Sequence, residues 1–485
     1  MSGFIDSVRG MRDLLPHEYA LQATVAARLT ATIEQYGFLP IDLPIIEHRD
    51  LYLRKLGEEL VGKVYEFSFG GRELALRPEW TASVLRAYVV RMQDQPLPLR
   101  LCYSGPVFRY ERPQRLTYRQ FTQTGVELIG GPAPRADAEC IGLACAALRA
   151  AGVNAFRVRV GHIGLIRAVL AALGLTERTQ GMLIWSLERM RTHGLDAVRS
   201  RLTDHEVSVP LDPAMLEGID DATAEALLLH ALREIGVNLR FGTRPPEQIV
   251  GRLVRKLRRD DPQPRIERAL TLLAELAAIH GRPDVVLPQV RRLLEAYGLP
   301  TDALSELRAI LDLSLAHGVD PAHLEVDMGL GRGLHYYTGV IFEIYSLHDI
   351  QLCGGGRYDD LVATLGGRQP TPAVGFAYGL ERVVAAAAPQ PVESAPVVLV
   401  AATDDASHPY AVEVANVLRA AGYIAVADVR GRSPAGNLRV ASRREFRFLA
   451  LVGSAEQAQR EVIWRDLEQR DDQRVALAAL PTIKP

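Results

Sequence analysis

The chain has 485 residues, a length that predicts roughly two to four domains. Hydrophobic residues make up 48% and charged residues 24%, a folded globular composition that excludes disorder or coiled coil as the main theme. The net charge of −2 excludes a wholly basic nucleic-acid coat, so any contact with nucleic acid has to come from local patches. Only four of the 56 basic residues are lysines, so arginine is the side chain expected to bind anions.

The cysteines and the start of the chain bear on metal sites and location. Cys102, Cys140, Cys145 and Cys353 form neither a C-x-x-C pair nor a histidine cluster with zinc spacing, so we expect no protein-bound metal and no disulfide. Residues 1–16 lack the apolar core of a signal peptide, and no apolar run is long enough to span a membrane. We therefore expect a cytoplasmic protein.

The first 390 residues predict a mixed domain that is interrupted by helices. Residues 1–162 and 322–390 share short β-rich runs, glycine punctuation and many arginines. Residues 163–321 are instead dominated by leucine, alanine and arginine at helical spacing. The spacing is clearest in three segments: Met215–Ile235, Ile266–Ile279 and Val290–Tyr297. We interpret the middle part as a helical insertion.

A basic segment within this insertion, Arg252–Arg265, is open to two interpretations. One is a solvated helix face, because charged residues commonly cover the outer side of a helix. The other is a contact with tRNA or another RNA, because clustered arginines bind phosphate groups.

Residues 397–485 predict a separate small domain. A proline- and serine-containing stretch ending at Pro396 has neither helical nor strand periodicity and is interpreted as a linker. Strands and helices then alternate, which favours an α/β domain with a largely parallel sheet. The expected strands are Val397–Ala402, Tyr423–Val429 and Phe448–Val452, and the expected helices are His408–Ala421 and Pro434–Phe446.

The strongest functional signal lies in Cys102–Gly130. The pattern predicts a β-hairpin whose first strand ends at Arg109 and whose second strand spans Tyr118–Ile129. Because side chains alternate along a strand, one face of the second strand holds Arg119, Phe121, Gln123, Gly125 and Glu127. Such a polar face suits the floor of a pocket for a small charged ligand, and a half-solvated edge strand is the alternative.

This segment closely resembles motif two of the class II aminoacyl-tRNA synthetases, in its histidyl-tRNA synthetase form. Six other segments resemble the same family in the same order: Arg9–Pro16, Tyr36–Pro44, Leu76–Tyr88, Leu330–Glu343, Cys353–Leu361 and Ala373–Val383. Residues 397–485 resemble its anticodon-binding domain more loosely. The resemblance implies an α+β fold, in which an antiparallel sheet flanked by helices carries a helical insertion and a C-terminal α/β anticodon-binding-like domain.

The resemblance implies a histidine–tRNA ligase. This family activates histidine with ATP to histidyl-adenylate, with Mg²⁺ as cofactor, and transfers the acyl group to tRNA(His); motif one forms a homodimer interface. Arg109 matches the arginine at the α-phosphate, and Arg382 the one at the distal phosphates. Arg332 matches the arginine that stabilises the pentavalent phosphorus, and Glu111 a residue near the adenine. Planar guanidinium groups suit these phosphate contacts.

Matches to the family's histidine pocket follow from the same resemblance. They are Glu79, Thr81, Gln123, Glu127, Tyr337 and Tyr358. Glu79 and Thr81 match residues that hold the α-amino group, and Gln123 matches one near the amino and carboxylate groups. Glu127 and Tyr337 match the pair that reads the imidazole, because a carboxylate and a phenol can bond both ring nitrogens.

Expected tRNA contacts lie at two places. Arg112 and Gln114 match the motif two loop that approaches the tRNA acceptor end. In the C-terminal domain, the segment Asp428–Arg447 holds six arginines, of which Arg439 and Arg443 are i, i+4 neighbours on an expected helix. We interpret this patch as a phosphate contact, and a solvated helix face is the alternative.

Departures from the family pattern leave three hypotheses open. Trp80 stands where glycine is usual, His335 where aspartate is usual, and Leu116-Thr117 where Gly-Arg is frequent. The hypotheses are a histidine–tRNA ligase, a non-catalytic paralogue that regulates ATP phosphoribosyltransferase in histidine biosynthesis, and a synthetase-like protein that loads a carrier other than tRNA. The presence of Arg382 and of a C-terminal domain favours the ligase.

Overall fold

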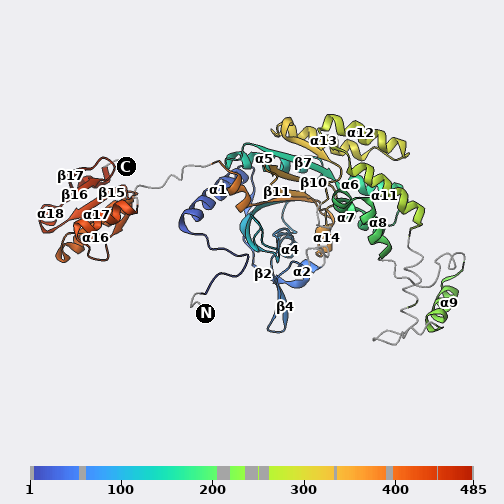
Figure 1. Cartoon of the computed structure of the whole chain (residues 1–485), viewed down its shortest axis with the longest axis horizontal. Coiled ribbons are helices and arrows are strands. Elements are labelled where there is room, and N and C mark those ends of the chain that lie inside the picture. The colour runs from blue at the N-terminus through green and yellow to red at the C-terminus, as the bar shows by residue number, and fades with distance from the viewer. Residues whose placement is uncertain are drawn as a thin grey trace. The chain divides into compact units, whose positions relative to one another are not determined.

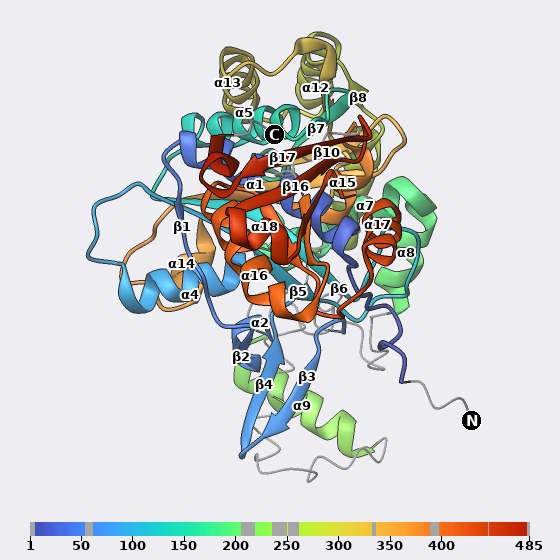
Figure 2. The same ribbon diagram turned by 90° about the vertical axis from the view of Figure 1, so that its left-hand side faces the viewer.

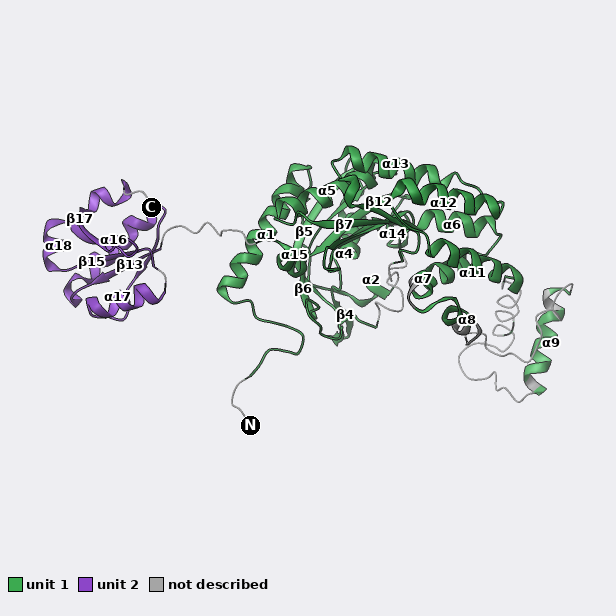
Figure 3. Ribbon diagram, turned by 45° about the horizontal axis from the view of Figure 1, so that its top comes forward, with its two compact units in different colours: residues 1–390 green, residues 391–485 purple. Residues whose placement is uncertain are grey.

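The computed structural model describes residues 5–53, 62–204, 219–234, 250, 261–331, 336–388, 397–444 and 446–482 (Figure 1). The chain divides into two compact units, Met1–Gln390 and Pro391–Pro485, which are coloured separately in Figure 3. Among the helices in the described ranges, none is long and apolar enough to cross a membrane.

Within the described residues, a nine-stranded sheet forms the centre of the first unit (Figure 1). In spatial order its strands are β1 (Leu39–Pro40), β5 (Leu99–Phe108), β6 (Gln120–Ile129), β12 (Ala373–Gly379), β11 (Gln351–Arg357), β10 (Val340–Ser346), β7 (Phe156–His162), β9 (Leu324–Asp327) and β8 (His280–Gly281). Neighbouring strands are antiparallel except for the pairs β1/β5 and β7/β9. The predicted hairpin β5–β6 therefore lies beside β12, a strand from much later in the chain.

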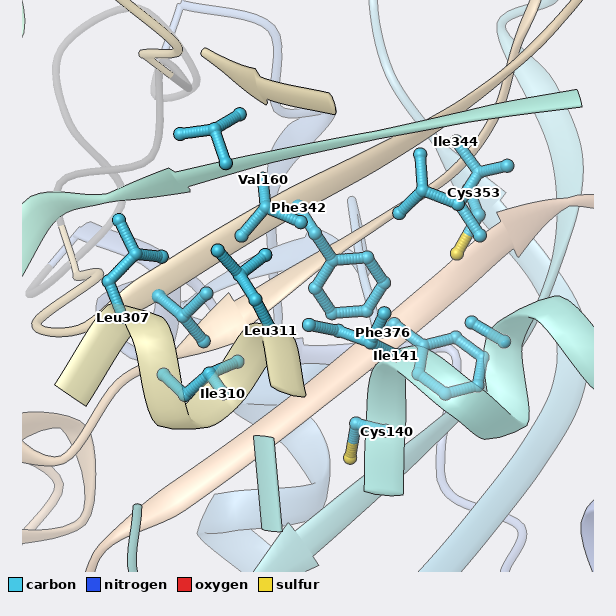
Figure 4. Packing of buried hydrophobic residues seen from close by; sticks show 14 of the residues in the cluster. Cys140, Ile141, Val160, Leu307, Ile310, Leu311, Phe342, Ile344, Cys353 and Phe376 are labelled. Atoms are coloured by element: carbon cyan, nitrogen blue, oxygen red, sulfur yellow. The ribbon is translucent and has the colours of Figure 1, made fainter. Parts of the chain in front are cut away.

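One face of this sheet is covered by helices. They are α1 (Pro16–Gln35), α5 (Arg135–Ala150), α13 (Ala303–Ala316) and α15 (Leu380–Ala386). Ile141 of α5 and Ile310 of α13 pack in one cluster with Phe342 and Phe376 of the strands (Figure 4). Burying each such side chain contributes about 1.5–3 kcal/mol. This packing holds β10, β11 and β12 as a rigid support for the opposite face.

The opposite face carries α2 (Arg49–Leu53), α4 (Thr81–Arg91) and α14 (Asp360–Thr364). Next to α2 a small three-stranded sheet projects from the body (Figure 2), formed by β2 (Ile46–His48), β4 (Arg72–Leu76) and β3 (Glu66–Phe69). Gly70 and Gly71 connect β3 to β4 with φ values of 58° and 73°. A two-residue turn with positive φ at both positions favours glycine, which explains this tight hairpin.

Arg357, the last residue of β11, ties the sheet to α5. Its Nε and Nη2 donate to the two carboxylate oxygens of Asp137, each at 2.9 Å. Its Nη1 donates to Asp359 at 2.9 Å. Arg357 is 3% exposed and Asp137 is fully buried, so each charge depends on the other for compensation. The pairing fixes the chain on both sides of Tyr358.

The described residues between β7 and β9 are largely helical, as predicted. Its helices before α13 are α6 (Ile163–Ala172), α7 (Glu177–His193), α8 (Leu195–Asp204), α9 (Asp221–Glu234), α11 (Gln263–Ala277) and α12 (Pro283–Ala296), and a short 3-10 helix, η2 (Pro321–His323), precedes β9. The helical predictions at Ile266–Ile279 and Val290–Tyr297 are confirmed by α11 and α12. The prediction at Met215–Ile235 is confirmed by α9 from Asp221 to Glu234, and residues 215–218 and 235 lie outside the described residues. The basic segment Arg252–Arg265 lies outside the described residues as far as residue 260.

The second unit contains a five-stranded sheet in its described residues. The order is β14 (Ile424–Ala427), β13 (Val397–Ala402), β15 (Phe448–Val452), β16 (Glu461–Asp466) and β17 (Asp471–Ala476). The helices are η3 (Asp405–Ser407), α16 (His408–Ala420), α17 (Pro434–Arg443), α18 (Ser454–Gln459) and η4 (Leu477–Thr482). The five predicted elements are confirmed, but a largely parallel sheet is wrong for β16 and β17, which pair antiparallel. A short turn joins these two strands, and such a turn permits only antiparallel pairing.

Candidate active site

The middle of the sheet presents a face of small residues around two polar ones. Gln123 of β6 lies opposite Gly105 of β5 and Gly379 of β12, and Glu127 lies opposite Gly375. A Cβ atom at Gly375 would collide with the Glu127 carboxylate, so glycine is needed there because the carboxylate occupies that space. The register confirms that Gln123 and Glu127 share a face.

A cavity of about 220 Å³ opens at one end of this face. It is lined by Arg109, Glu111, Leu116, Thr117, Tyr118, Phe121, Gln123, Gln351, Leu352, Cys353, Gly354, Ala377, Gly379, Glu381 and Arg382. The structure therefore brings together Arg109, Glu111, Gln123 and Arg382, as the resemblance implies. Sequence reasoning missed Glu381, although it directly precedes Arg382 in a segment that had been singled out.

The two cavity arginines are oriented by backbone carbonyl groups. Nε of Arg109 donates to the carbonyl oxygen of Pro78 at 2.8 Å, and its guanidinium carbon lies 5.3 Å from the ring centroid of Phe121. Arg382 donates to the carbonyl oxygens of Leu116 and Gln351, both at 3.3 Å. These carbonyl bonds orient the two guanidinium groups, whose planar sets of donors suit an anionic ligand.

A loop from β5 to β6 closes this cavity. Gln114 and Thr117 exchange two backbone hydrogen bonds, of 3.0 and 3.3 Å, across a tight turn in which Leu116 has a φ of 59°. Positive φ is uncommon for leucine and costs on the order of 1 kcal/mol. Glu111 pairs with Lys63 at 3.6 Å. The side chains of Arg112 and Gln114 are exposed on the loop.

The N-terminal segment holds the base of the same loop. The backbone amide of Arg119 donates to the carbonyl oxygen of Gly10 at 2.8 Å, and its side chain donates to the carbonyl oxygens of Arg9 and Glu111, both at 3.1 Å. Its guanidinium carbon lies 4.0 Å from the ring centroid of Tyr110. Arg119 lies just before β6, which begins at Gln120, and its side chain points to the loop. The prediction that Arg119 shares the pocket face of Gln123 is therefore wrong.

Glu127 is the centre of a buried polar cluster. Its Oε1 accepts from the hydroxyls of Thr81 at 2.7 Å and Tyr103 at 3.0 Å, and its Oε2 accepts from Tyr358. Burial raises the pKa of Glu127 to about 8, the hydroxyl of Thr81 lowers it, the charge of Glu79 raises it and the hydroxyl of Tyr103 lowers it. The carboxyl is therefore predominantly protonated near neutral pH until a cationic group or a further donor reaches it.

Glu79 precedes α4 and carries an unsatisfied acceptor. Its Oε1 accepts from the amide of Ala82 at 2.9 Å, while its buried Oε2 has no hydrogen-bond partner in the part of the chain that the structure describes. Burial raises the pKa of Glu79. The buried Oε1 of Gln123 likewise lacks a partner among the described residues. Buried acceptors of this kind are normally satisfied, so both indicate where a ligand's N–H groups bind.

Three tyrosines enclose the cluster. The Tyr336 ring lies 4.8 Å from that of Tyr337 and 5.7 Å from that of Tyr358, and all three side chains are buried. The structure thus brings Tyr337 and Tyr358 into the same apolar cluster, in which Tyr358 contacts Glu127. Arg332 and His335 lie outside the described residues.

In the second unit, Arg439 and Arg443 are exposed on one face of α17. Not all arginines of the basic segment are free. Arg432 pairs with Asp428, and Arg447 pairs with Asp466 at 2.9 Å. These ion pairs reduce the predicted patch to four exposed arginines that form no ion pair with a described residue: Arg430, Arg439, Arg443 and Arg444.

The antiparallel sheet and its arginine-lined cavity define the catalytic domain of a class II aminoacyl-tRNA synthetase. A family model described as histidyl-tRNA synthetase matches residues 10–236 and 252–383, and one described as anticodon binding domain matches residues 396–483. The chain belongs to the histidyl-tRNA synthetase family.

Relatives and solved structures agree over nearly the whole chain. This chain is 31% identical over 462 residues to a histidine–tRNA ligase of Methanocaldococcus jannaschii, and the match covers 95% of this chain and 94% of that protein. The corresponding enzyme of Thermococcus kodakarensis is 31% identical over 481 residues, covering 97% of this chain and 96% of the relative. The fold matches the crystal structure of histidyl-tRNA synthetase from Nostoc sp. PCC 7120 with a TM-score of 0.67 and 21% identity, covering 99% of this chain and 98% of that one.

A further structural neighbour bears on the regulatory hypothesis. It is the Bacillus halodurans protein described as an ATP phosphoribosyltransferase regulatory subunit/histidyl-tRNA synthetase. Its TM-score is 0.65 at 22% identity, over 94% of this chain and 100% of that one. A likeness at this identity shows a shared fold, and the two named activities are not separated by fold.

Proposed function

We propose that this chain ligates histidine to tRNA(His) in two steps, by way of histidyl-adenylate. The observation that carries the proposal is a single sheet face on which an arginine-lined cavity meets a buried carboxyl cluster. Gln123 belongs to both, since it lines the cavity and lies on the face of Glu127. Arg109 bonds the backbone of Pro78, the residue before Glu79. An anionic phosphate and a cationic amino acid would therefore lie side by side.

The proposed chemistry needs orientation and charge stabilisation more than a protein nucleophile. The histidine carboxylate attacks the α-phosphorus of ATP, and pyrophosphate leaves. A terminal hydroxyl of the tRNA then attacks the acyl carbon, and AMP leaves. Arg109 would hold the α-phosphate and Arg382 the distal phosphates, with Glu111 near the adenine, because fixed guanidinium groups stabilise the charge that develops. Arg332 remains the expected third arginine.

Mg²⁺ is the proposed cofactor. Glu111 and Glu381 contribute carboxylates to the cavity, and the buried Oε2 of Glu381 has no hydrogen-bond partner within the described ranges. Hard carboxylate oxygens suit Mg²⁺, which commonly binds one or two carboxylates together with the phosphates of a nucleotide. When bound, the ion would neutralise phosphate charge.

For histidine, the buried cluster supplies the contacts. Glu79 and Gln123 offer the unsatisfied acceptors that suit an α-amino group, with Thr81 beside them. Glu127 and Tyr337 would read the imidazole, and Tyr358 would complete the pocket. A site with buried polar groups rejects a ligand that leaves them unpaired, which supports selection of histidine over apolar amino acids.

We also propose two contacts with tRNA(His). Arg112 and Gln114 would meet the acceptor end, and Arg439 and Arg443 the anticodon arm. Support comes from the exposure of all four side chains and from the match of residues 396–483 to an anticodon binding domain. Exposed arginines suit contact with the phosphate backbone.

A homodimer is proposed because apolar side chains are exposed around the projecting sheet. On β3 Phe69 is 75% and Phe67 38% exposed, and Ile46 on β2 of the same sheet is 49% exposed. Clustered exposed apolar groups are typical of protein interfaces. Sedimentation should show a dimer that Phe69→Asp weakens, whereas Leu347→Asp, at a leucine that is 60% exposed between β10 and β11, should not. A monomeric wild type would contradict the proposal.

Location and domain division are also proposals. A cytoplasmic location is supported by the cysteines, since none of the four forms a disulfide: Cys102, Cys140, Cys145 and Cys353. We keep a division into residues 1–162 and 322–390 as catalytic domain, 163–321 as helical insertion and 397–485 as anticodon-binding-like domain.

The regulatory alternative is not favoured, because the curated relatives that align along nearly the whole chain are named histidine–tRNA ligases. Exchange of labelled pyrophosphate into ATP, measured with each standard amino acid, tests the activity directly. We expect histidine alone to support exchange and tRNA(His) to be charged. Arg382→Ala should lower exchange by roughly 10²–10³-fold, while Arg292→Ala, at an exposed arginine of α12, should not. A wild type without histidine-dependent exchange would refute the ligase.

A further inference from the structure

Three buried side chains form a stacked column beside Glu127. The guanidinium carbon of Arg77 lies 3.5 Å from the ring centroid of Trp80. The Trp80 ring stacks on Tyr103 with centroids 4.8 Å apart and planes only 9° from parallel. Arg77, Trp80 and Tyr103 are each less than 5% exposed. The column is therefore part of the interior, and none of its members has a role in the function proposed above.

One end of the column is anchored to the backbone. Arg77 donates from Nε to the carbonyl oxygen of Pro106 and from Nη1 to that of Leu43, both at 2.8 Å. Nε1 of Trp80 donates to the carbonyl oxygen of Gly105 at 3.4 Å. A Cβ atom at Gly105 would lie 2.8 Å from Cζ2 of Trp80, so glycine leaves the room that the indole occupies. The indole is thus held between β5 and a fixed cation.

The other end of the column reaches the amino-acid pocket. The hydroxyl of Tyr103 donates to Oε1 of Glu127 at 3.0 Å. Gly125, opposite Tyr103 on β6, has no side chain to obstruct that hydroxyl, since a Cβ atom there would lie 2.8 Å from it. A stacked indole restricts the rotation of the phenol ring, because tilting the ring would lose the contact with Trp80.

We propose that Trp80 is a positioning residue for amino-acid recognition. By stacking on Tyr103, it keeps the phenol hydroxyl on Oε1 of Glu127 and so fixes the direction in which the carboxyl faces its ligand. Trp80 acts through Tyr103 and does not itself touch the substrate. The inference rests on the proposed function, since it assigns Glu127 to the recognition of histidine.

A double-mutant cycle tests the inference. Trp80→Phe replaces the indole by a smaller ring and so reduces the stacking on Tyr103, and Tyr103→Phe removes only the hydroxyl. We expect each substitution to raise the KM for histidine about tenfold in pyrophosphate exchange, the effect of losing one buried hydrogen bond. The KM for ATP and kcat should stay within a few-fold of wild type. Because both substitutions break the same contact, the histidine KM of the double variant should be no higher than that of the more impaired single variant.

Two further readouts separate positioning from general loss of packing. The Tyr103 hydroxyl favours the ionised form of Glu127, so both single variants should shift the pH profile of the histidine KM to higher pH. Trp464→Phe makes the same change in the core of the second unit and should alter neither KM nor the profile.

The outcomes are distinct. Multiplying effects in the double variant, or an unshifted pH profile in Trp80→Phe, would overturn the positioning role while leaving the ligase intact. A Trp80→Phe protein with unchanged histidine KM would do the same. A wild type without histidine-dependent exchange would instead refute the proposed function, and this inference with it.

Discussion

The hydroxyl of Thr81, the first residue of α4, lies 2.7 Å from Oε1 of Glu127 on β6 and donates to it. The contact joins the start of a helix to the middle of the sheet. It also places Glu79, two residues before Thr81, close enough for its charge to act on Glu127. Two carboxyl groups are thus buried together in a pocket that is otherwise lined by hydroxyls and rings.

This burial predicts a pH-dependent stability. The pKa of Glu127 is raised from 4.5 to about 8 in the folded protein, so the folded state binds more protons than the unfolded state between these values. The contribution of Glu127 to the free energy of unfolding is therefore fully present below about pH 4.5, and it is lost as the pH rises through about 8. Glu127→Gln should remove this contribution, so its melting temperature should change by a few degrees less between pH 5 and pH 8.

Thermal melts across this pH range check the prediction. Glu295→Gln, at an exposed position on α12, is the matched control and should keep the wild-type slope. Histidine should stabilise the wild type more at pH 8 than at pH 5, because an imidazole N–H that donates to Glu127 favours the ionised carboxyl. Identical slopes for wild type and Glu127→Gln would show that Glu127 does not titrate abnormally.

Arg109 should not tolerate lysine. Arg109→Lys keeps the positive charge but loses the hydrogen bond from Nε to Pro78 and the planar fork that suits a phosphate. Losing one oriented donor to the transition state predicts a fall in exchange rate on the order of 10²-fold. Arg91→Lys, at an exposed arginine that ends α4, should be neutral. A rate within a few-fold of wild type would mean that Arg109 supplies only charge.

The buried ion pair of Arg357 and Asp137 should be much more sensitive than a half-exposed one. Asp137→Ala leaves a buried guanidinium without its main partner and should cost about 3–5 kcal/mol of unfolding free energy. Glu139→Ala breaks the pair with Arg100, which is 31% exposed, and should cost less than about 1 kcal/mol. Urea unfolding measures both. Similar costs would indicate that water or a neighbour compensates Arg357.

The arginines of α17 should act on tRNA alone. Replacing Arg439 and Arg443 by alanine should weaken tRNA binding and lower its salt dependence by about one to two phosphate contacts, while histidine-dependent exchange stays unchanged. Arg460→Ala, which breaks an ion pair with Glu413 in the same unit, is the control. The affinity for tRNA, measured at several salt concentrations, tests this prediction. An unchanged slope of log affinity against log salt concentration would assign the tRNA contact to other residues.

The sequence by itself determined the local features of the site. Alternation with period two places Gln123 and Glu127 on one face of β6, since that period belongs to the strand and needs no partner. Local patterns also predict the helices α16 and α17. In α17 the side chain of Ser433 accepts from the Gly436 amide, and Pro434 begins the helix. The resemblance of seven ordered segments then pointed to the family.

Only the tertiary structure decided which distant residues meet. The pairing of β6 with β12 brings Glu381 and Arg382 to the cavity, and no local pattern specifies which strand will be the neighbour. Strand alternation placed Arg119 with the pocket residues, yet the N-terminal segment draws it to the loop. An ion pair with Asp466 on β16 likewise removes Arg447 from the basic patch.

Trp80 shows the difference most clearly. The sequence shows only a bulky residue where the family has glycine, and it does not determine which side chains the indole contacts. In the structure the indole stacks on the Tyr103 ring and contacts the Arg77 guanidinium, in space left by Gly105 on β5. Stacking depends on the mutual orientation of side chains from separate elements, and packing in three dimensions alone sets that orientation.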